Sequence, residues 1–138
     1  MSYLLDTNIL SEVRKPRGDE RVKAWFASVR SDELFLSVLV VGEIRQGVER
    51  LKRRDPAQAA TYNVWLDTLK RDYRDRILPI TVDMAETWGR FNAPDPLPVI
   101  DSLLAATART HKSTLVTRNV ADVAKTGVPL LNPFEAHQ

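Results

Sequence analysis

The segment YLLDTNILSE, residues 3–12, begins as a short apolar run and stops at an aspartate, Asp6. An apolar run of this length predicts a buried strand, and the Asp-Thr-Asn that follows is rich in residues that begin helices. Asp6 is therefore predicted to lie at the carboxyl end of a strand, which is the edge where open α/β sheets bind ligands. On this segment alone, a helix cap and a functional site are equally good interpretations of the Asp6 side chain.

Composition limits both the fold and the chemistry. The chain has 138 residues, of which 43% are hydrophobic, and this fits one domain, residues 1–138, with a single core. It has no apolar run long enough to span a bilayer and no secretion signal at its start, so we expect a cytoplasmic protein that does not contact membranes. Because cysteine is absent, disulfides, thiolate nucleophiles and cysteine-based zinc sites are excluded.

The basic residues are clustered, although the formal net charge is only +2. Clustering of this kind suits a polyanionic partner. Acidic residues are interleaved with the basic ones, so for each cluster taken singly a solvated helix surface is the favoured interpretation. The three clusters are Arg14-Lys15 with Arg17, Arg50 with Lys52-Arg53-Arg54, and Lys70-Arg71 with Arg74 and Arg76.

Short apolar runs alternate along the chain with segments of helical periodicity. Such alternation predicts an α/β fold with a central parallel sheet of about five short strands, flanked by helices on both faces. The predicted strands are 3–5, 34–36, 77–80, 114–117 and 128–131. The predicted helices are 7–14, 19–29, 37–54, one that starts at 55–56, 81–91, 99–111 and a short one that holds Asp122.

The helix predicted over residues 37–54 carries Glu43 beside its apolar stripe rather than within it. At about 100° per residue, Gly47, Arg50 and Arg54 follow Glu43 along the same flank. A glycine inside a helix costs about 1 kcal/mol relative to alanine, so we expect Gly47 to permit close approach of a backbone or a ligand, with packing the favoured reason. The apolar stripe itself consists of Val40, Ile44, Val48 and Leu51.

The second half of the chain leads to another aspartate, Asp101. Residues 93–98 hold three prolines at alternate positions, which predicts a stiff extended loop that delivers Asp101 to its place in the first turn of helix 99–111. Residues 132–138 are predicted to form a tail. The inward face of helix 81–91 is predicted to consist of Met84, Ala85, Trp88 and Phe91.

Polar side chains are predicted to meet at one edge of the sheet. Asp6, Thr117 and Asn119 follow buried strands, and the carboxyl ends of parallel strands share one edge. Glu43 lies early in a helix that follows another strand, and Asp101 joins them if the proline loop carries its helix across. Clustered carboxylates repel one another unless a cation compensates them, and Mg²⁺ prefers such oxygen ligands. The sequence therefore predicts a magnesium site.

Histidine is too scarce for several other chemistries. His111 lies at a predicted helix end and His137 in the tail, which disfavours a zinc site, a Ser-His-Asp triad and paired-histidine nuclease chemistry. What remains is metal-assisted hydrolysis of a phosphodiester, in which metal ions activate a water and neutralise charge on the scissile phosphate.

Four motifs occur in order along the chain: LLDTN at 4–8, Glu43 followed by Gly47, Asp101 followed by LAATA at 104–108, and LVTRN at 115–119. Together they resemble the motifs of PIN-domain ribonucleases, and most closely those of VapC-type toxins of type II toxin–antitoxin systems. The resemblance covers nearly the whole chain. It implies that Asp6, Glu43 and Asp101 are the metal-binding acids of a nuclease that cuts RNA, with Thr117 alongside them.

The family often carries a fourth acid where this chain has Asn119. Three interpretations are open: Asn119 serves as a neutral ligand or water-holder, Asp122 reaches into the site, or three acids suffice. We favour Asn119 over Asp122, because Asp122 is more simply a residue of the short helix.

The resemblance also implies a cofactor and partners. It implies an endoribonuclease that depends on Mg²⁺, for which Mn²⁺ can substitute. It also implies that this enzyme is a toxin and that a cognate antitoxin inhibits it. In this family an arginine of the antitoxin often enters the acidic pocket. A homodimer within a larger toxin–antitoxin assembly is expected. Arg50 and Arg54 are predicted to hold RNA phosphates, because helical geometry puts them on the flank that carries Glu43.

Two other functions are compatible with the same residues. One is a non-catalytic binding module, whose acids hold a structural ion or an arginine-rich peptide. The other is a magnesium phosphatase that uses Asp6 as its nucleophile, although such enzymes typically have a second aspartate where this chain has Asn8.

Overall fold

A five-stranded sheet forms the centre of the protein. The computed structural model describes residues 1–135, so the end of the predicted tail, with His137, lies outside the described residues. The strand order is β3-β2-β1-β4-β5 and every pairing is parallel, which confirms the predicted sheet. The strands are β1 (Tyr3–Leu5), β2 (Leu34–Ser37), β3 (Ile77–Leu78), β4 (Thr114–Val116) and β5 (Leu130–Leu131).

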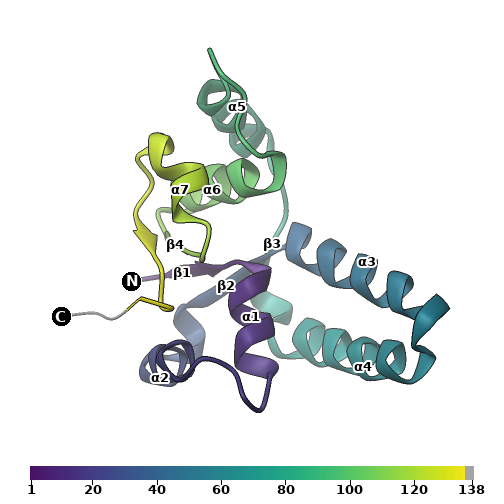
Figure 1. The fold of residues 1–138 in the computed structure, drawn as a ribbon. Helices are drawn as coiled ribbons and strands as arrows, with labels where there is room; N and C mark the ends of the chain where they lie inside the picture. The colour runs from purple at the N-terminus through teal and green to yellow at the C-terminus, as the bar shows by residue number, and fades with distance from the viewer. Residues whose placement is uncertain (136–138) are drawn as a thin grey trace.

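Helices lie on both sides of this sheet, as predicted (Figure 1). In Figure 1, α1 and α2 lie below the sheet and α5, α6 and α7 lie above it. The helices are α1 (Thr7–Arg14), α2 (Glu20–Ser28), α3 (Val38–Arg54), α4 (Pro56–Asp72), α5 (Val82–Phe91), α6 (Val99–His111) and α7 (Val120–Val123), with 3₁₀ turns at Ser31–Glu33, Arg74–Arg76 and Ala124–Thr126. No helix within residues 1–135 has the length and apolar character needed to cross a membrane.

Proline shortens two of the strands relative to the prediction. β3 ends before Pro79 and β5 begins after Pro129, because proline has no N–H to donate to a ladder. The Pro129 carbonyl still accepts a hydrogen bond from the Leu115 backbone N–H at 2.9 Å. β3 is an edge strand, which is the position in a sheet where a proline is tolerated.

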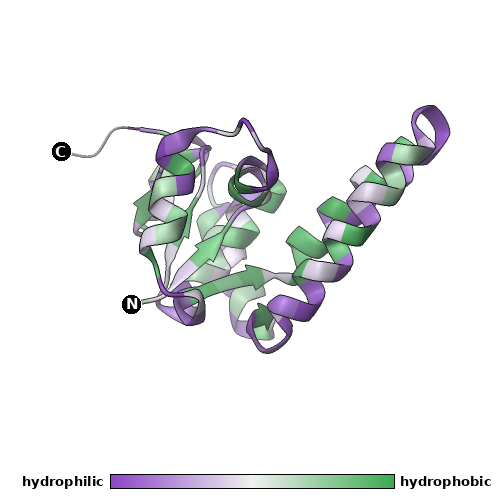
Figure 2. Cartoon of the chain, turned by 90° about the horizontal axis from the view of Figure 1, so that it is seen from below, coloured by the Kyte–Doolittle hydropathy of each residue, from purple (hydrophilic) through white to green (hydrophobic). Residues whose placement is uncertain are grey.

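The core is built on the central strands. The side chains of β1, β2 and β4 meet those of the helices on both faces, and Figure 2 shows these strands as strongly hydrophobic. Burial of a leucine side chain stabilises the fold by roughly 1.5–3 kcal/mol, so this layer supplies much of the driving force. The apolar strand residues with almost no exposed surface are Leu4, Leu5, Leu34, Leu36, Leu115 and Val116.

Helices α3 and α4 form a hairpin that projects from the body of the molecule (Figure 2). The predicted stripe of α3 is confirmed, since Val40, Ile44, Val48 and Leu51 are its buried residues. The packing explanation for Gly47 is wrong: beyond its chain neighbours and the adjacent backbone of α3, a Cβ built there would meet no described atom within 4 Å. Nothing in residues 1–135 approaches Gly47 closely enough to require a glycine.

One of the basic clusters contributes to this packing. The Arg14 guanidinium at the end of α1 lies 4.3 Å from the ring centre of Tyr62 and 5.2 Å from that of Trp65, both on α4. Cation–π contacts of this kind are worth about 0.5–2 kcal/mol. Arg14 is thus used in holding α4 against α1.

Three further expectations need correction. Ala85 is exposed, and of the residues predicted to face inward on α5 only Met84 is fully buried. Residues 93–98 lack regular structure, as predicted, but the path through 92–95 bends rather than extends. The described part of the tail is packed, because Phe134 is buried in the core and its ring lies 4.5 Å from the Arg118 guanidinium.

Arg76 joins three backbone segments. Its guanidinium donates to the carbonyl oxygens of Leu34 at 2.7 Å, Asp72 at 2.9 Å and Ser31. We expect Arg76→Met to lower the free energy of unfolding by about 1–3 kcal/mol, because it leaves these carbonyls without their donor. Urea unfolding measures this. Arg74→Met, at an exposed position of the same 3₁₀ turn, should change it by less than about 0.5 kcal/mol, and equal losses in both variants would contradict the assignment.

Candidate functional site

Asp6 lies at the point in the sheet where the strand order reverses. From β1 the chain adds β2 and then β3 on one side, and β4 and β5 follow on the other, so the reversal lies between β1 and β4. In open parallel sheets the carboxyl ends of the strands beside this reversal form the ligand-binding crevice. Asp6 directly follows β1 and Thr117 directly follows β4. These two residues define the candidate site.

The Asp6 carboxylate is buried and fully engaged. Only 5% of Asp6 is exposed. Its Oδ1 accepts the Thr7 backbone N–H at 2.7 Å, and its Oδ2 accepts the Thr117 hydroxyl at 2.7 Å. Asp6 therefore caps α1, which confirms the capping interpretation, and the same carboxylate lies at the sheet edge where a functional site is predicted.

Thr117 and Asn8 hold the β1 and β4 ends together. The Thr117 hydroxyl donates to Asp6 and accepts the Asn119 backbone N–H at 3.0 Å. Asn8 donates its amide to Asp6 Oδ2 at 3.2 Å, and its Oδ1 accepts the Arg118 backbone N–H at 3.3 Å. Asn8 was not predicted as a site residue. Its position two residues after the strand-end aspartate was the available signal.

Glu43 reaches the site through Thr7. The Thr7 hydroxyl donates to Glu43 Oε1 at 2.7 Å, across 36 positions of sequence. Thr7 is also the first residue of α1, so one residue links the cap of α1 to the first turns of α3. Sequence reasoning missed this role, because a threonine at a helix start is ordinarily only a good capping neighbour.

Asp101 lies in the first turn of α6, and its neighbours fix that turn. Ser102 is fully buried, accepts the Trp88 Nε1–H at 2.9 Å and donates to the Pro98 carbonyl at 2.7 Å. The Asn92 side chain accepts the Leu97 backbone N–H at 2.7 Å. These bonds hold the proline loop so that α6 starts at the edge that carries Asp6.

The environment disfavours ionisation of two of the acids. Burial raises the pKa of Asp6, and the Glu43 charge acts in the same direction, while hydrogen bonds from Thr117 and Thr7 lower it. Burial also raises the pKa of Asp101, and the charge of Asp6 adds to that increase. Asp6 is therefore close enough to Asp101 for its ionised carboxylate to disfavour ionisation of Asp101.

Asn119 and Asp122 both lie beside Asp101. The Asn119 side chain lowers the pKa of Asp101, whereas Asp122 raises it. Both side chains are exposed. Asn119 and Asp122 are thus both near enough to take part.

Arg50 and Arg54 lie away from the acids. Both are exposed near the C-terminal end of α3. The separation of seven positions from Glu43 to Arg50 corresponds to about 10 Å along the helix axis. These arginines do not join the site, but they continue along the helix that carries Glu43.

The residue types in the site fit a hard divalent cation. Asp6, Glu43 and Asp101 offer only oxygen ligands, and none of them forms an ion pair within residues 1–135. The structure differs from the prediction in one respect: no three acidic or histidine side chains among the described residues converge on one ion. Glu43 is instead bonded to Thr7. Two carboxylates are enough for Mg²⁺, which keeps several of its waters.

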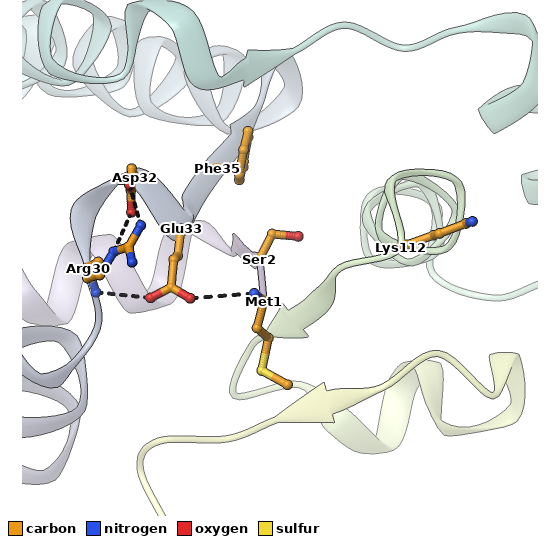
Figure 3. A pocket seen from close by; sticks show the side chains of 7 residues that line it. All are labelled: Met1, Ser2, Arg30, Asp32, Glu33, Phe35 and Lys112. Carbon is orange, nitrogen blue, oxygen red and sulfur yellow. Dashed lines mark hydrogen bonds and ion pairs between the residues drawn. The ribbon is translucent and has the colours of Figure 1, made fainter.

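A hollow at the opposite edge of the sheet has different chemistry (Figure 3). It has a volume of ≈ 460 Å³ and includes residues just before β1 and β2. Its charges are paired: Arg30 contacts Asp32 at 2.7 Å, and Glu33 lies 3.6 Å from the Met1 amino group. In Figure 3 the Lys112 side chain points away from these pairs. The uncompensated carboxylates therefore distinguish the carboxyl edge as the candidate site.

The chain is similar to known proteins over nearly its whole length. A family model described as PIN domain matches residues 3–126. Toxin FitB of Neisseria gonorrhoeae is 30% identical, over 95% of this chain and 97% of its own length. A solved structure of FitAB bound to an IR36 DNA fragment has a TM-score of 0.90 at 27% identity, covering 99% of this chain and 98% of that chain.

One further relative and one further solved structure also match this chain over nearly their whole length. VapC ribonuclease Y4jK of Sinorhizobium fredii is 29% identical, over 96% of this chain and 97% of its own length. A solved toxin–antitoxin complex from Klebsiella pneumoniae has a TM-score of 0.70 at 26% identity, covering 98% of this chain and 100% of that chain. The likeness thus extends across all the elements that position the acids.

The raised pKa values of Asp6 and Asp101 make the stability of the cation-free protein depend on pH. A carboxyl with a higher pKa in the folded state stabilises the fold below its unfolded pKa, here 3.8, and this contribution is lost as pH rises through the folded pKa. In EDTA we expect Asp101→Asn to gain stability over the wild type as pH rises above that value. Thermal unfolding from about pH 3 to about pH 8 measures the difference.

The matched control is Asp83→Asn, which removes an exposed aspartate from the first turn of α5. It should not produce the same gain. A pH profile of Asp101→Asn that runs parallel to the wild type would contradict the prediction.

Proposed function

The chain belongs to the PIN-domain family, and from that premise we propose that it is a divalent-metal-dependent endoribonuclease and the toxin of a toxin–antitoxin pair. The observation that carries the proposal is that Asp6 follows β1 at the reversal of the sheet and that its charge raises the pKa of Asp101, while neither carboxylate forms an ion pair within residues 1–135. RNA as the substrate is supported by the relative named a VapC ribonuclease.

Asp6 and Asp101 would hold the metal ion, with Glu43 as the further acid. Magnesium is the proposed ion and Mn²⁺ its substitute, because both accept oxygen ligands. Such an ion supplies a nucleophilic water at neutral pH and stabilises negative charge on the phosphoryl oxygens. The charge of the ion would also remove the repulsion that raises the pKa of Asp101.

The protein's own contribution is to orient the acids. Thr117 fixes Asp6 from the β4 side, and Thr7 fixes Glu43 from α1. Asn119 offers a neutral amide beside Asp101, where a further acid would raise the repulsion. We propose Asn119 as a holder of water or phosphate oxygen, with Thr117 as a positioning residue.

Partners follow from the family. The toxin–antitoxin complex at 26% identity supports a cognate antitoxin for this chain. An arginine of that partner could pair with the acids in place of the metal, since its planar group binds carboxylates bidentately. We propose that residues 1–138 act as one domain, as a homodimer within the complex, in the cytoplasm.

The phosphatase alternative is disfavoured by Asn8. Such enzymes typically have a second carboxylate two residues after the nucleophile, whereas here Asn8 supplies an amide that donates to Asp6 Oδ2 at 3.2 Å. An amide does not act as a general acid or base, so the chain lacks the group that would protonate the leaving oxygen at this position.

We expect Asp101→Asn to lower RNA cleavage in Mg²⁺ by about a hundredfold or more, because it removes a ligand charge without changing volume. Asp6→Asn should have the same effect. The assay is cleavage of a labelled RNA by purified variants, with circular dichroism to confirm the fold. Asp83→Asn, away from the site, is the control. Full activity of either site variant would refute the metal-site assignment.

Arg50→Ala combined with Arg54→Ala should weaken RNA binding and leave the cleavage position unchanged. If both arginines hold phosphates, the logarithmic salt slope becomes shallower by about one unit for each phosphate that is no longer held. Binding is measured in Ca²⁺ across a salt series. Lys70→Ala with Arg74→Ala removes equal charge from exposed positions near the end of α4 and serves as the control. Superimposable salt slopes for the wild type and the Arg50–Arg54 double variant would show that these arginines do not hold phosphates.

A further inference from the structure

A groove beside Glu43 lies outside the chemistry described so far. It has a volume of ≈ 530 Å³ and is lined by Val38, Leu39, Gly42, Glu43, Gln46 and Ile100. This volume falls within the range of about 300–1,000 Å³ that is typical of small-molecule sites. Because Glu43 lines the groove and also bonds to Thr7 beside Asp6, whatever enters the groove lies next to one of the candidate acids.

The walls combine apolar faces with a single amide. Val38, Leu39 and Ile100 supply aliphatic surface, and Val38 is 40% exposed despite its apolar side chain. The Gln46 side chain is exposed and has no hydrogen-bond partner within residues 1–135. Unpaired bases are held in this way in other proteins, between apolar side chains and with hydrogen bonds to one edge.

Gly42 keeps the groove open. A Cβ built on Gly42 would meet no other atom within 4 Å, so nothing in the described chain needs a glycine there. Glycine inside a helix costs about 1 kcal/mol relative to alanine. The missing side chain leaves free volume in the groove at the level of Glu43, one position away in the sequence.

The position of Gln46 links the groove to the proposed RNA path. Gln46 lies between Glu43 and Arg50 on α3, at spacings of three and four residues, so the three side chains share one side of the helix. An RNA strand that runs from the acids toward Arg50 therefore passes the groove. A glutamine amide offers a donor and an acceptor side by side, and this pattern matches adenine.

On these grounds we infer that the groove binds an unpaired base of the RNA next to the scissile phosphate and prefers adenine. The inference rests on the proposed ribonuclease function and adds its base preference. A second copy of the chain is the less suitable occupant, because the groove contains Glu43, and charged residues are depleted from the centres of protein interfaces.

The test uses fluorescein-labelled RNA hexamers of uridine in which one internal position is A, C, G or U. Binding to the full-length wild-type protein is measured by fluorescence anisotropy in Ca²⁺, and cleavage of the same RNAs is mapped in Mg²⁺. We expect the adenine hexamer to bind about tenfold more tightly than the others, and to be cut beside the adenine.

Two variants test the walls and the amide separately. Gly42→Leu fills the groove and should remove the adenine preference together with about tenfold of affinity. Gln46→Met keeps the length of the side chain but loses the amide, so affinity for the four hexamers should become nearly equal. Gly89→Leu, at an exposed glycine of α5 whose Cβ would also meet nothing, is the matched control and should behave as wild type.

The outcomes separate this inference from the proposed function. If wild type cuts RNA but binds the four hexamers equally, or if Gly42→Leu leaves the preference intact, the base-binding groove is refuted and the ribonuclease stands. If Gly42→Leu instead changes the oligomeric state in sedimentation, the groove is an interface between copies and the inference is also wrong. If wild type neither binds nor cuts any RNA, the proposed function fails and this inference with it.

Discussion

The hydrogen bond from the Thr117 hydroxyl to Asp6 Oδ2, 2.7 Å long and buried, is the contact on which the rest of the site depends. It joins the ends of β1 and β4, the two strands between which the sheet reverses direction. The bond keeps the Asp6 carboxylate directed into the crevice. Thr7 and Asn8 extend the same network to α3 and to the loop after β4.

The site is assembled against an electrostatic cost. Burial raises the pKa of both Asp6 and Asp101; the charge of Glu43 adds to the increase at Asp6, and the charge of Asp6 adds to the increase at Asp101. A fold keeps such a pair only if other packing outweighs it, and here the fully buried leucines of β1 and β2 provide that packing. The arrangement is suited to a cation rather than to the stability of the empty protein.

Much of the fold could be predicted from the sequence. Apolar runs and helical periodicity predicted the parallel sheet and the buried stripe of α3. The local sequence is enough for this, because apolar side chains recur every 2 residues on one face of a strand and every 3.6 residues on one face of a helix. The partners of side chains were less accessible: the Thr7 bond to Glu43 depends on how α1 and α3 pack. Gly47 and the packed Phe134 also misled, since a residue type does not tell what surrounds it.

The Asp6–Thr117 bond spans 111 positions of the chain, and this separation has a consequence for protein synthesis. Because β1 is made first but takes β4 as a neighbour, the crevice cannot close until residues near the C-terminus have left the ribosome. A nascent chain that stops before α6 lacks both Asp101 and Thr117. Translation that stops before α6 therefore releases fragments that lack the acid pair, and such fragments cannot form the candidate site.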